Sequence, residues 1–145
     1  MKILVPVDGS KYSMEGAKAA LDIARTKKAD IILMTVTPFV AGLDLEMSAK
    51  ETDNFNNSMK NRGEEVIRKA EEIFTAEGIS TRSVLASSIS AADEIINTAE
   101  KEKADLIVIG SLGMGGSTTR FFMGSVASKV VSHAPCSVLV VKLKE

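Results

Sequence analysis

The chain alternates short apolar runs with stretches whose apolar residues recur every three or four positions, and this alternation constrains the fold most. Nearly continuous apolar runs are typical of strands buried on both faces, whereas a period near 3.6 is typical of helices with one buried face. Four helical stretches separate five such runs, which lie at 2–7, 31–37, 79–85, 105–109 and 137–141. The alternation predicts an α/β fold with a single, doubly wound, five-stranded parallel sheet and helices on both faces.

Turn-forming and capping residues mark the ends of these elements. Pro6 is expected where the first strand ends, and Ser10 or Ser13 can cap the helix that follows. Gly78 is a natural C′ residue for the second helix, and the polar residues that interrupt the apolar run at 79–85 suggest an edge strand. The helical pattern is lost over 39–54, which predicts a long irregular connection.

Length and composition limit the protein class. A chain of 145 residues predicts one domain over 1–145, and a net charge of -1 gives no overall electrostatic attraction to nucleic acid or to an anionic membrane. No apolar run approaches the roughly 18 residues of a membrane helix. The single Cys136 excludes an intrachain disulfide and fits a reducing compartment. We therefore expect a cytoplasmic protein without nucleic-acid or membrane partners.

A glycine-rich segment, 110–125, joins the fourth strand to the fourth helix. Such loops hold phosphate in α/β proteins because glycine lets the backbone approach the anion and the helix N-terminus supplies free N–H groups. The segment is neither a P-loop, which needs Gly-Lys-Ser/Thr, nor a G-x-G-x-x-G motif. The residues alone leave two interpretations, a phosphate or nucleotide site and a turn whose glycines only satisfy backbone geometry.

Asp8 follows the first strand as the 110–125 segment follows the fourth. If these two strands are neighbours at the point where strand order reverses, both loops face one crevice. A carboxylate there suits ribose hydroxyls or a divalent metal, although Asp8 also fits a turn and helix cap.

Other candidate residues have simpler interpretations. Arg120 is either a residue that reaches a phosphate or an exposed loop residue. For Phe121-Phe122-Met123, a role as a packing anchor is favoured over base stacking. His133 is the only histidine, so a structural role at a helix end is favoured for it. Cys136 is interpreted as a buried, inert thiol. No nucleophile–base pair is visible, so efficient catalysis is not predicted.

The glycine spacing resembles the nucleotide signature of the universal stress protein family, G-x2-G-x9-G-[S/T]. It is carried here by Gly110, Gly113 and Gly124-Ser125, and the similarity extends to 3–10 and to 126–141. The resemblance implies a strand order of 3-2-1-4-5. Two features depart from the pattern. Ten residues separate Gly113 from Gly124, an extra residue that Gly115 and Gly116 can loop out, and Ser88-Ile89-Ser90 replaces a frequent Gly-x-Pro.

Resemblance to the ATP-binding branch of the family also implies roles for individual residues. Asp8 would accept hydrogen bonds from ribose or approach Mg²⁺ or Mn²⁺, and Val36 would contact adenine through its backbone. The remaining residues implied in ATP binding line the nucleoside (Pro6 and Val7, with Asp8) or hold the phosphates (Gly110, Gly113, Gly124 and Ser125).

The function implied by this resemblance is that of a cytoplasmic, ATP-binding stress-response or signalling protein. It would act through its nucleotide-bound state and through a homodimer formed by the last strand, 137–142. Two alternatives stay open, a weak or partner-stimulated ATPase and a regulatory or scaffold module that binds no nucleotide.

Overall fold

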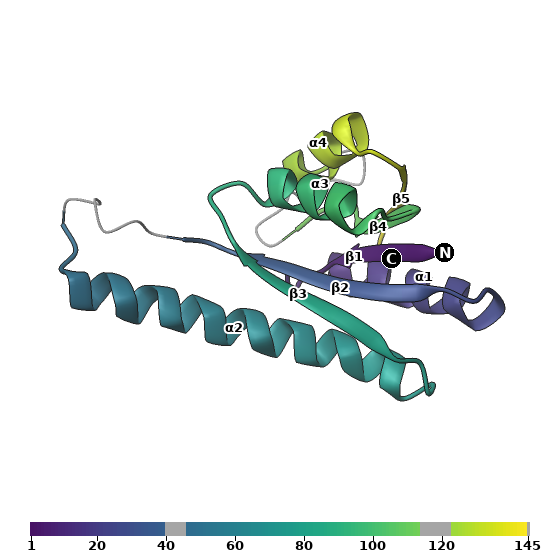
Figure 1. Ribbon diagram of the computed structural model, residues 1–145, viewed down its shortest axis with the longest axis horizontal. Helices are drawn as coiled ribbons and strands as arrows, with labels where there is room; N and C mark the ends of the chain where they lie inside the picture. The colour runs from purple at the N-terminus through teal and green to yellow at the C-terminus, as the bar shows by residue number, and fades with distance from the viewer. Residues whose placement is uncertain (40–45, 114–122, 145) are drawn as a thin grey trace.

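The computed structural model describes residues 1–39, 46–113 and 123–144 (Figure 1). Strands and helices alternate along these residues, as predicted. Their bounds in chain order are β1 (Lys2–Pro6), α1 (Lys11–Thr26), β2 (Asp30–Thr37), α2 (Ala49–Thr75), β3 (Thr81–Ser87), α3 (Ala91–Glu102), β4 (Leu106–Gly110), α4 (Ser125–His133) and β5 (Ser137–Val141).

The strands form one parallel sheet in the order β3-β2-β1-β4-β5, which confirms the expected topology. Strand order reverses between β1 and β4, where Ile3 pairs with Leu106 and Leu4 with Ile107. Parallel neighbours end at the same edge of a sheet, so the segments that follow β1 and β4 emerge side by side. Ligands of doubly wound sheets bind at this edge.

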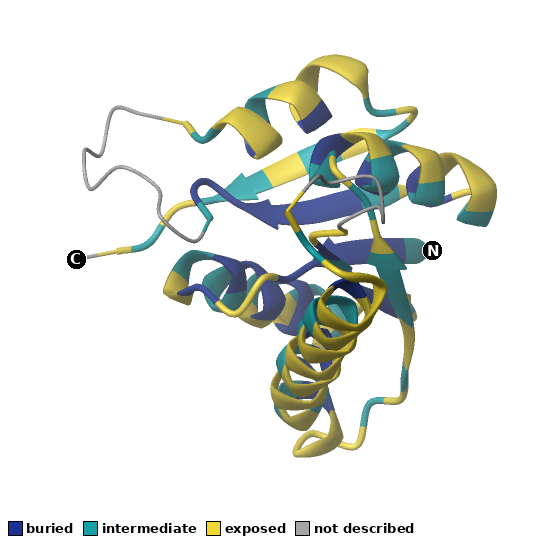
Figure 2. Ribbon diagram, turned by 90° about the vertical axis from the view of Figure 1, so that its left-hand side faces the viewer, coloured by how far each residue is buried: buried dark blue, intermediate teal, exposed yellow. Residues whose placement is uncertain are grey.

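Helices cover both faces of the sheet (Figure 1). Side chains alternate between faces along each strand, so Ile3 and Val5 of β1 pack with α1 and α2, whereas Leu4 packs with α3 and α4. All three are fully buried, and the central strands form the buried layer in Figure 2. This two-sided burial explains why the strand sequences are nearly continuous apolar runs.

Local hydrogen bonds account for the helix ends. Ser10 caps α1 by accepting a bond from the Ser13 N–H at 3.1 Å. After α2, Gly78 has a φ of +71°, and the Ile79 N–H donates to the Phe74 carbonyl at 3.0 Å. This geometry is a Schellman motif with Gly78 at C′, as predicted.

The expectation of an irregular connection over 39–54 is wrong for its last residues. Helix α2 begins at Ala49, and Ser48 caps it by accepting from the Glu51 N–H at 3.1 Å. The Ser48 hydroxyl also lies 3.2 Å from the Glu51 carboxylate. Within α2, the residues before Phe55 are exposed apart from Thr52, so they carry no apolar period from which a helix is predicted. Residues 40–45 of this segment lie outside the described residues.

The outermost strands are β3 and β5. Polar Arg82 and Ser83 interrupt the apolar pattern of β3 and are exposed, in agreement with its predicted edge position. The strand is shifted two residues toward the C-terminus relative to the expected 79–85. Among the helices described, none combines the length and hydrophobicity needed to cross a membrane.

Candidate functional site

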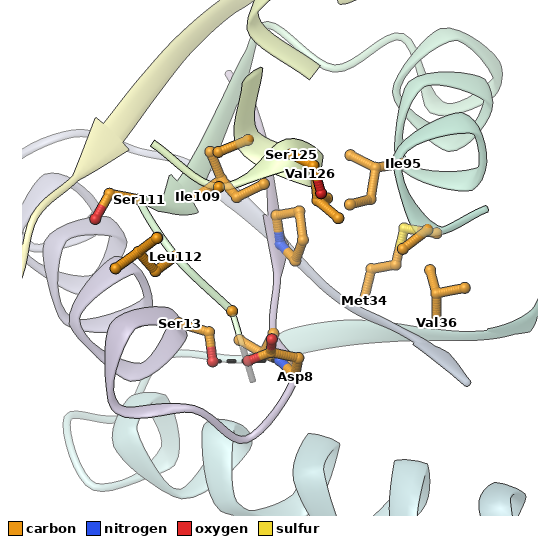
Figure 3. A pocket seen from close by; sticks show the side chains of 17 residues that line it. Asp8, Ser13, Met34, Val36, Ile95, Ile109, Ser111, Leu112, Ser125 and Val126 are labelled. Carbon is orange, nitrogen blue, oxygen red and sulfur yellow. Dashed lines mark hydrogen bonds between the residues drawn. The ribbon is translucent and has the colours of Figure 1, made fainter. Parts of the chain in front are cut away.

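A cavity of about 620 Å³ lies where the carboxyl ends of β1 and β4 meet. Its volume is within the range of pockets that hold small ligands. Figure 3 shows its labelled side chains converging from the sheet, α1, α3 and α4. The described residues that line it are Pro6, Val7, Asp8, Ser13, Met34, Val36, Ala91, Ile95, Ile109, Gly110, Ser111, Leu112, Gly113, Gly124, Ser125, Val126 and Ala127. All eight residues implicated by sequence are among them.

Asp8 occupies the turn between β1 and α1. Its Oδ1 accepts a hydrogen bond from the Ser10 N–H at 2.9 Å, and its own N–H donates to the Ser13 hydroxyl at 3.2 Å. These bonds form an Asx turn, so the turn interpretation of Asp8 is correct. Asp8 also lines the cavity and is exposed, so this turn holds the carboxylate at the cavity.

Gly113 brings the second loop against Asp8. A Cβ atom built on Gly113 would lie 2.7 Å from Asp8 Oδ2, well inside van der Waals contact. The segments after β1 and β4 therefore face one crevice, as the sequence analysis expected.

Gly110 stands at the end of β4 beneath α1. A Cβ atom at this position would lie 2.6 Å from the Tyr12 carbonyl oxygen and 3.0 Å from the Ser13 nitrogen. Both neighbours are backbone atoms, so the missing side chain allows the first turn of α1 to pack directly on β4. This contact also holds Ser13 at the cavity.

Helix α4 points its N-terminus into the cavity. Gly124 is the N-cap residue, and it has no side chain with which to cap this end. The Gly124 N–H donates to the Ser111 carbonyl at 2.8 Å, which leaves the N–H groups of Ser125 and Val126 as the first of the helix at the cavity. Exposed N–H groups and the helix dipole favour an anion at such a position.

The hydrogen bond from Gly124 to Ser111 also closes the base of the loop that connects Gly113 to Gly124. The intervening loop is one residue longer than the usual spacing, but both of its ends are fixed at the cavity. Gly115 and Gly116, which were expected to absorb the extra residue, lie outside the described residues.

One wall of the cavity is apolar. Met34 and Val36 reach it from the end of β2, and Ala91 and Ile95 reach it from the first turns of α3 (Figure 3). The family resemblance implicated Val36, whereas Ile95 was not predicted as a site residue, because its helical apolar spacing gives no sign of a cavity. Ile95 is in fact 3% exposed, so it serves the core and the cavity wall together.

The described lining of the cavity contains few charged groups. Asp8 is the one ionisable side chain among the described lining residues. The described parts of the chain hold no cluster of three or more His, Cys, Asp or Glu residues that would suit a metal ion. A cation here would have to take most of its ligands from a bound molecule or from water, an arrangement that Mg²⁺ commonly adopts with phosphates.

The other candidates that the structure describes do not line this cavity. His133 lies at the end of α4, where its Nδ1 is 3.1 Å from the Lys129 carbonyl oxygen. Cys136 packs beside the α3–α4 core, and burial, aided by the Asp105 carboxylate, raises the pKa of its thiol. Met123 is 39% exposed rather than a buried anchor. Arg120, Phe121 and Phe122 lie outside the described residues.

Comparison with known proteins agrees with this architecture. Residues 1–142 match the model of the universal stress protein family. A universal stress protein of Methanocaldococcus jannaschii is 39% identical over 144 residues, which cover 97% of this chain and 81% of the relative. Among solved structures, the universal stress protein UspA from Lactobacillus plantarum has a TM-score of 0.82 at 25% identity, with 97% of each chain covered.

Some solved relatives hold nucleotides. The universal stress protein from Archaeoglobus fulgidus was solved in complex with dAMP, and it has a TM-score of 0.71 at 24% identity, with 98% of each chain covered. Other structures of the family are complexes with cAMP or with AMP. At these identities the similarity shows the shared fold. The family match over nearly the whole length, together with the relative from Methanocaldococcus jannaschii, shows more: this chain belongs to the universal stress protein family.

Proposed function

We propose that the chain binds an adenine nucleotide in the cavity between β1 and β4. The observation that carries the proposal is that one cavity brings together an apolar wall, a carboxylate and a helix N-terminus. Adenine, ribose and phosphate require these three environments. The nucleotide complexes of solved relatives with the same fold support the choice of ligand.

Each part of the nucleotide has a proposed set of contacts. Adenine lies against Met34, Val36 and Ile95, with the Val36 backbone as its polar contact, and Pro6 and Val7 border the nucleoside. Asp8 accepts hydrogen bonds from the ribose hydroxyls. The phosphates lie near Gly113 and the α4 N-terminus, where the Ser125 hydroxyl adds a donor. Gly110 contributes by letting the first turn of α1 pack on β4. Gly124 contributes through the hydrogen bond from its N–H to the Ser111 carbonyl, which closes the loop.

ATP with Mg²⁺ or Mn²⁺ is the nucleotide we propose. The residues present fit a cation held by one carboxylate, Asp8, with phosphate oxygens and water as its other ligands. The cation would neutralise part of the triphosphate charge, which Asp8 otherwise repels. We therefore expect ATP binding to depend on divalent cation far more than AMP binding does.

We further propose that the protein is cytoplasmic and acts in stress response or signalling through its nucleotide-bound state and its dimer. The described lining residues offer hydroxyls from Ser13, Ser111 and Ser125 but no histidine to activate a nucleophile. Binding is thus favoured over efficient hydrolysis, and a weak or partner-stimulated ATPase is the alternative.

Titration calorimetry tests the proposal. AMP, ATP with and without Mg²⁺, and GTP are titrated into the wild-type protein and into the Asp8→Ala variant. We expect adenine nucleotides to bind below millimolar concentration and Asp8→Ala to weaken binding by about 10- to 100-fold, the effect of losing one to two charged hydrogen bonds. Absence of binding below millimolar concentration contradicts the proposal and favours a scaffold module.

A further inference from the structure

The three glycines of the signature meet different neighbours at the position of their missing Cβ atoms. For Gly110 the neighbours are backbone atoms of α1, the nearest at 2.6 Å. For Gly124 the nearest is the Ser111 carbonyl oxygen at 3.3 Å. For Gly113, the described residues place only the Asp8 carboxylate within 4 Å, with Oδ2 at 2.7 Å and Cγ at 3.9 Å.

Backbone conformation does not require glycine at position 113. Among the described residues, the glycines with a positive φ are Gly9 and Gly78, so Gly113 has a conformation that alanine also adopts. The obstacle to a side chain at this position is therefore steric, and among the described residues the neighbour that creates it is the Asp8 carboxylate.

Asp8 cannot move aside without losing its present geometry. Its Oδ1 is held by the Ser10 N–H at 2.9 Å, and its main-chain N–H is bonded to the Ser13 hydroxyl at 3.2 Å. A methyl group on residue 113 would push on Oδ2, an atom at the tip of the Asp8 side chain, rather than on the backbone. The low-energy response is rotation of the carboxylate, which breaks the bond to Ser10.

We propose that Gly113 is a positioning residue for Asp8, and that its missing side chain leaves the space in which the Asp8 carboxylate is held. The requirement for glycine at 113 then comes from Asp8 and not from a phosphate that approaches the loop. The proposal rests on the proposed function in one respect, because it assumes that Asp8 contacts the nucleotide.

A double-mutant cycle with AMP as the probe, followed by NMR titration, tests this inference. We expect Gly113→Ala to weaken AMP binding by about tenfold, the effect of losing one hydrogen bond to a charged group. In an Asp8→Ala background, which removes the obstructing atoms, Gly113→Ala should change affinity by less than about twofold. Independent, multiplying effects of the two substitutions would overturn the proposal, because they would indicate a direct phosphate contact at 113.

Gly124→Ala is the matched comparison, since it makes the same change within the same signature but meets no side chain of the described residues closer than 3.7 Å. Whatever the size of its own effect on AMP affinity, that effect should multiply with the effect of Asp8→Ala. If the effect of Gly124→Ala on AMP affinity depended on Asp8 as strongly as that of Gly113→Ala, the cycle would be reporting a general loosening of the loop. That result would contradict a specific role for Gly113.

A ligand-free crystal structure of Gly113→Ala gives a second readout that needs no nucleotide. We expect the Asp8 carboxylate to have rotated and its bond to the Ser10 N–H to be broken, with the backbone of residues 111–113 unmoved. An unmoved Asp8 beside a displaced loop would overturn the inference. If wild-type protein fails to bind AMP, the proposed function fails, while this structure still decides the role of Gly113.

Discussion

Gly110 matters at the scale of the residue because the backbone of α1 occupies the space beside it. The Tyr12 carbonyl oxygen and carbon lie 2.6 and 2.7 Å from the position of a Cβ atom. Backbone atoms of a helix anchored on a sheet cannot yield as a side-chain tip can. Its neighbour in the signature, Gly113, faces a carboxylate, so two glycines of one motif serve different purposes.

Gly110→Ala is therefore expected to lower the free energy of unfolding by about 1–3 kcal/mol, the usual cost of overpacking a core. Urea denaturation measures the change. Gly124→Ala serves as the control and should cost less than about 1 kcal/mol, since its nearest neighbour is 3.3 Å away. Equal losses for the two variants would contradict the packing role of Gly110.

The Cys136 thiol provides a second test at this scale. Burial, together with the Asp105 carboxylate, raises its pKa, so the thiol stays protonated to a higher pH than a free cysteine. Because only the thiolate is alkylated, the rate of iodoacetamide modification should rise at a higher pH than that of a cysteine-containing peptide. Modification at neutral pH as fast as that of the peptide would contradict an inert thiol.

Helix α2 shows at the element scale how a capping residue starts a helix without help from the core. Its first described turns are largely exposed, and its apolar contacts with the sheet come from residues such as Ile67 and Phe74 farther along. At the start, the Ser48 hydroxyl accepts from the Glu51 N–H and donates to the Glu51 carboxylate, two bonds at the Ser-x-x-Glu spacing that is typical of a capping box.

Ser48→Ala should reduce stability by about 1 kcal/mol and shorten α2, because it removes the acceptor for the Glu51 N–H. Circular dichroism with thermal unfolding measures both effects. Ser58→Ala makes the same chemical change at an exposed interior position of α2, where alanine is the better helix former, and should be neutral or slightly stabilising. A loss of helix in Ser58→Ala but not in Ser48→Ala would contradict this account of the helix start.

At the scale of the whole molecule, β5 ends the sheet with an unpaired edge in the single chain. Leu139 lies in the middle of this strand and is 41% exposed. Apolar edge strands favour pairing with another chain, and two-fold pairing of like strands closes the edge. We propose that residues 137–142 form the homodimer interface.

Analytical ultracentrifugation at micromolar concentration should show a dimer for the wild type and a monomer for Leu139→Lys, because the substitution places like charges across the two-fold axis. Ile89→Lys is the matched control, since Ile89 is 94% exposed but follows β3 at the opposite edge. A monomeric wild type, or a dimer disrupted by Ile89→Lys instead, would reject β5 as the interface.

Much of this architecture follows from sequence periodicity, because a strand buried on both faces and a helix buried on one carry different patterns. The strand order needed the family resemblance, since periodicity leaves the neighbours of each strand open. The start of α2 was missed because exposed turns carry no apolar period, although Ser48-x-x-Glu51 marks it. Ile95 and Met34 were missed as site residues because packing in a core and lining a cavity select the same side chains.

The most direct test of the central claim is an NMR titration of isotope-labelled protein with AMP, which shows where the nucleotide binds. We expect saturable shifts of the amide signals of Asp8, Val36, Gly113, Ser125 and Val126, the residues at the carboxyl ends of β1, β2 and β4 and at the start of α4. Signals from the exposed first turns of α2 should stay unchanged. An absence of saturable shifts at millimolar AMP, or shifts confined to surfaces away from this cavity, would contradict it.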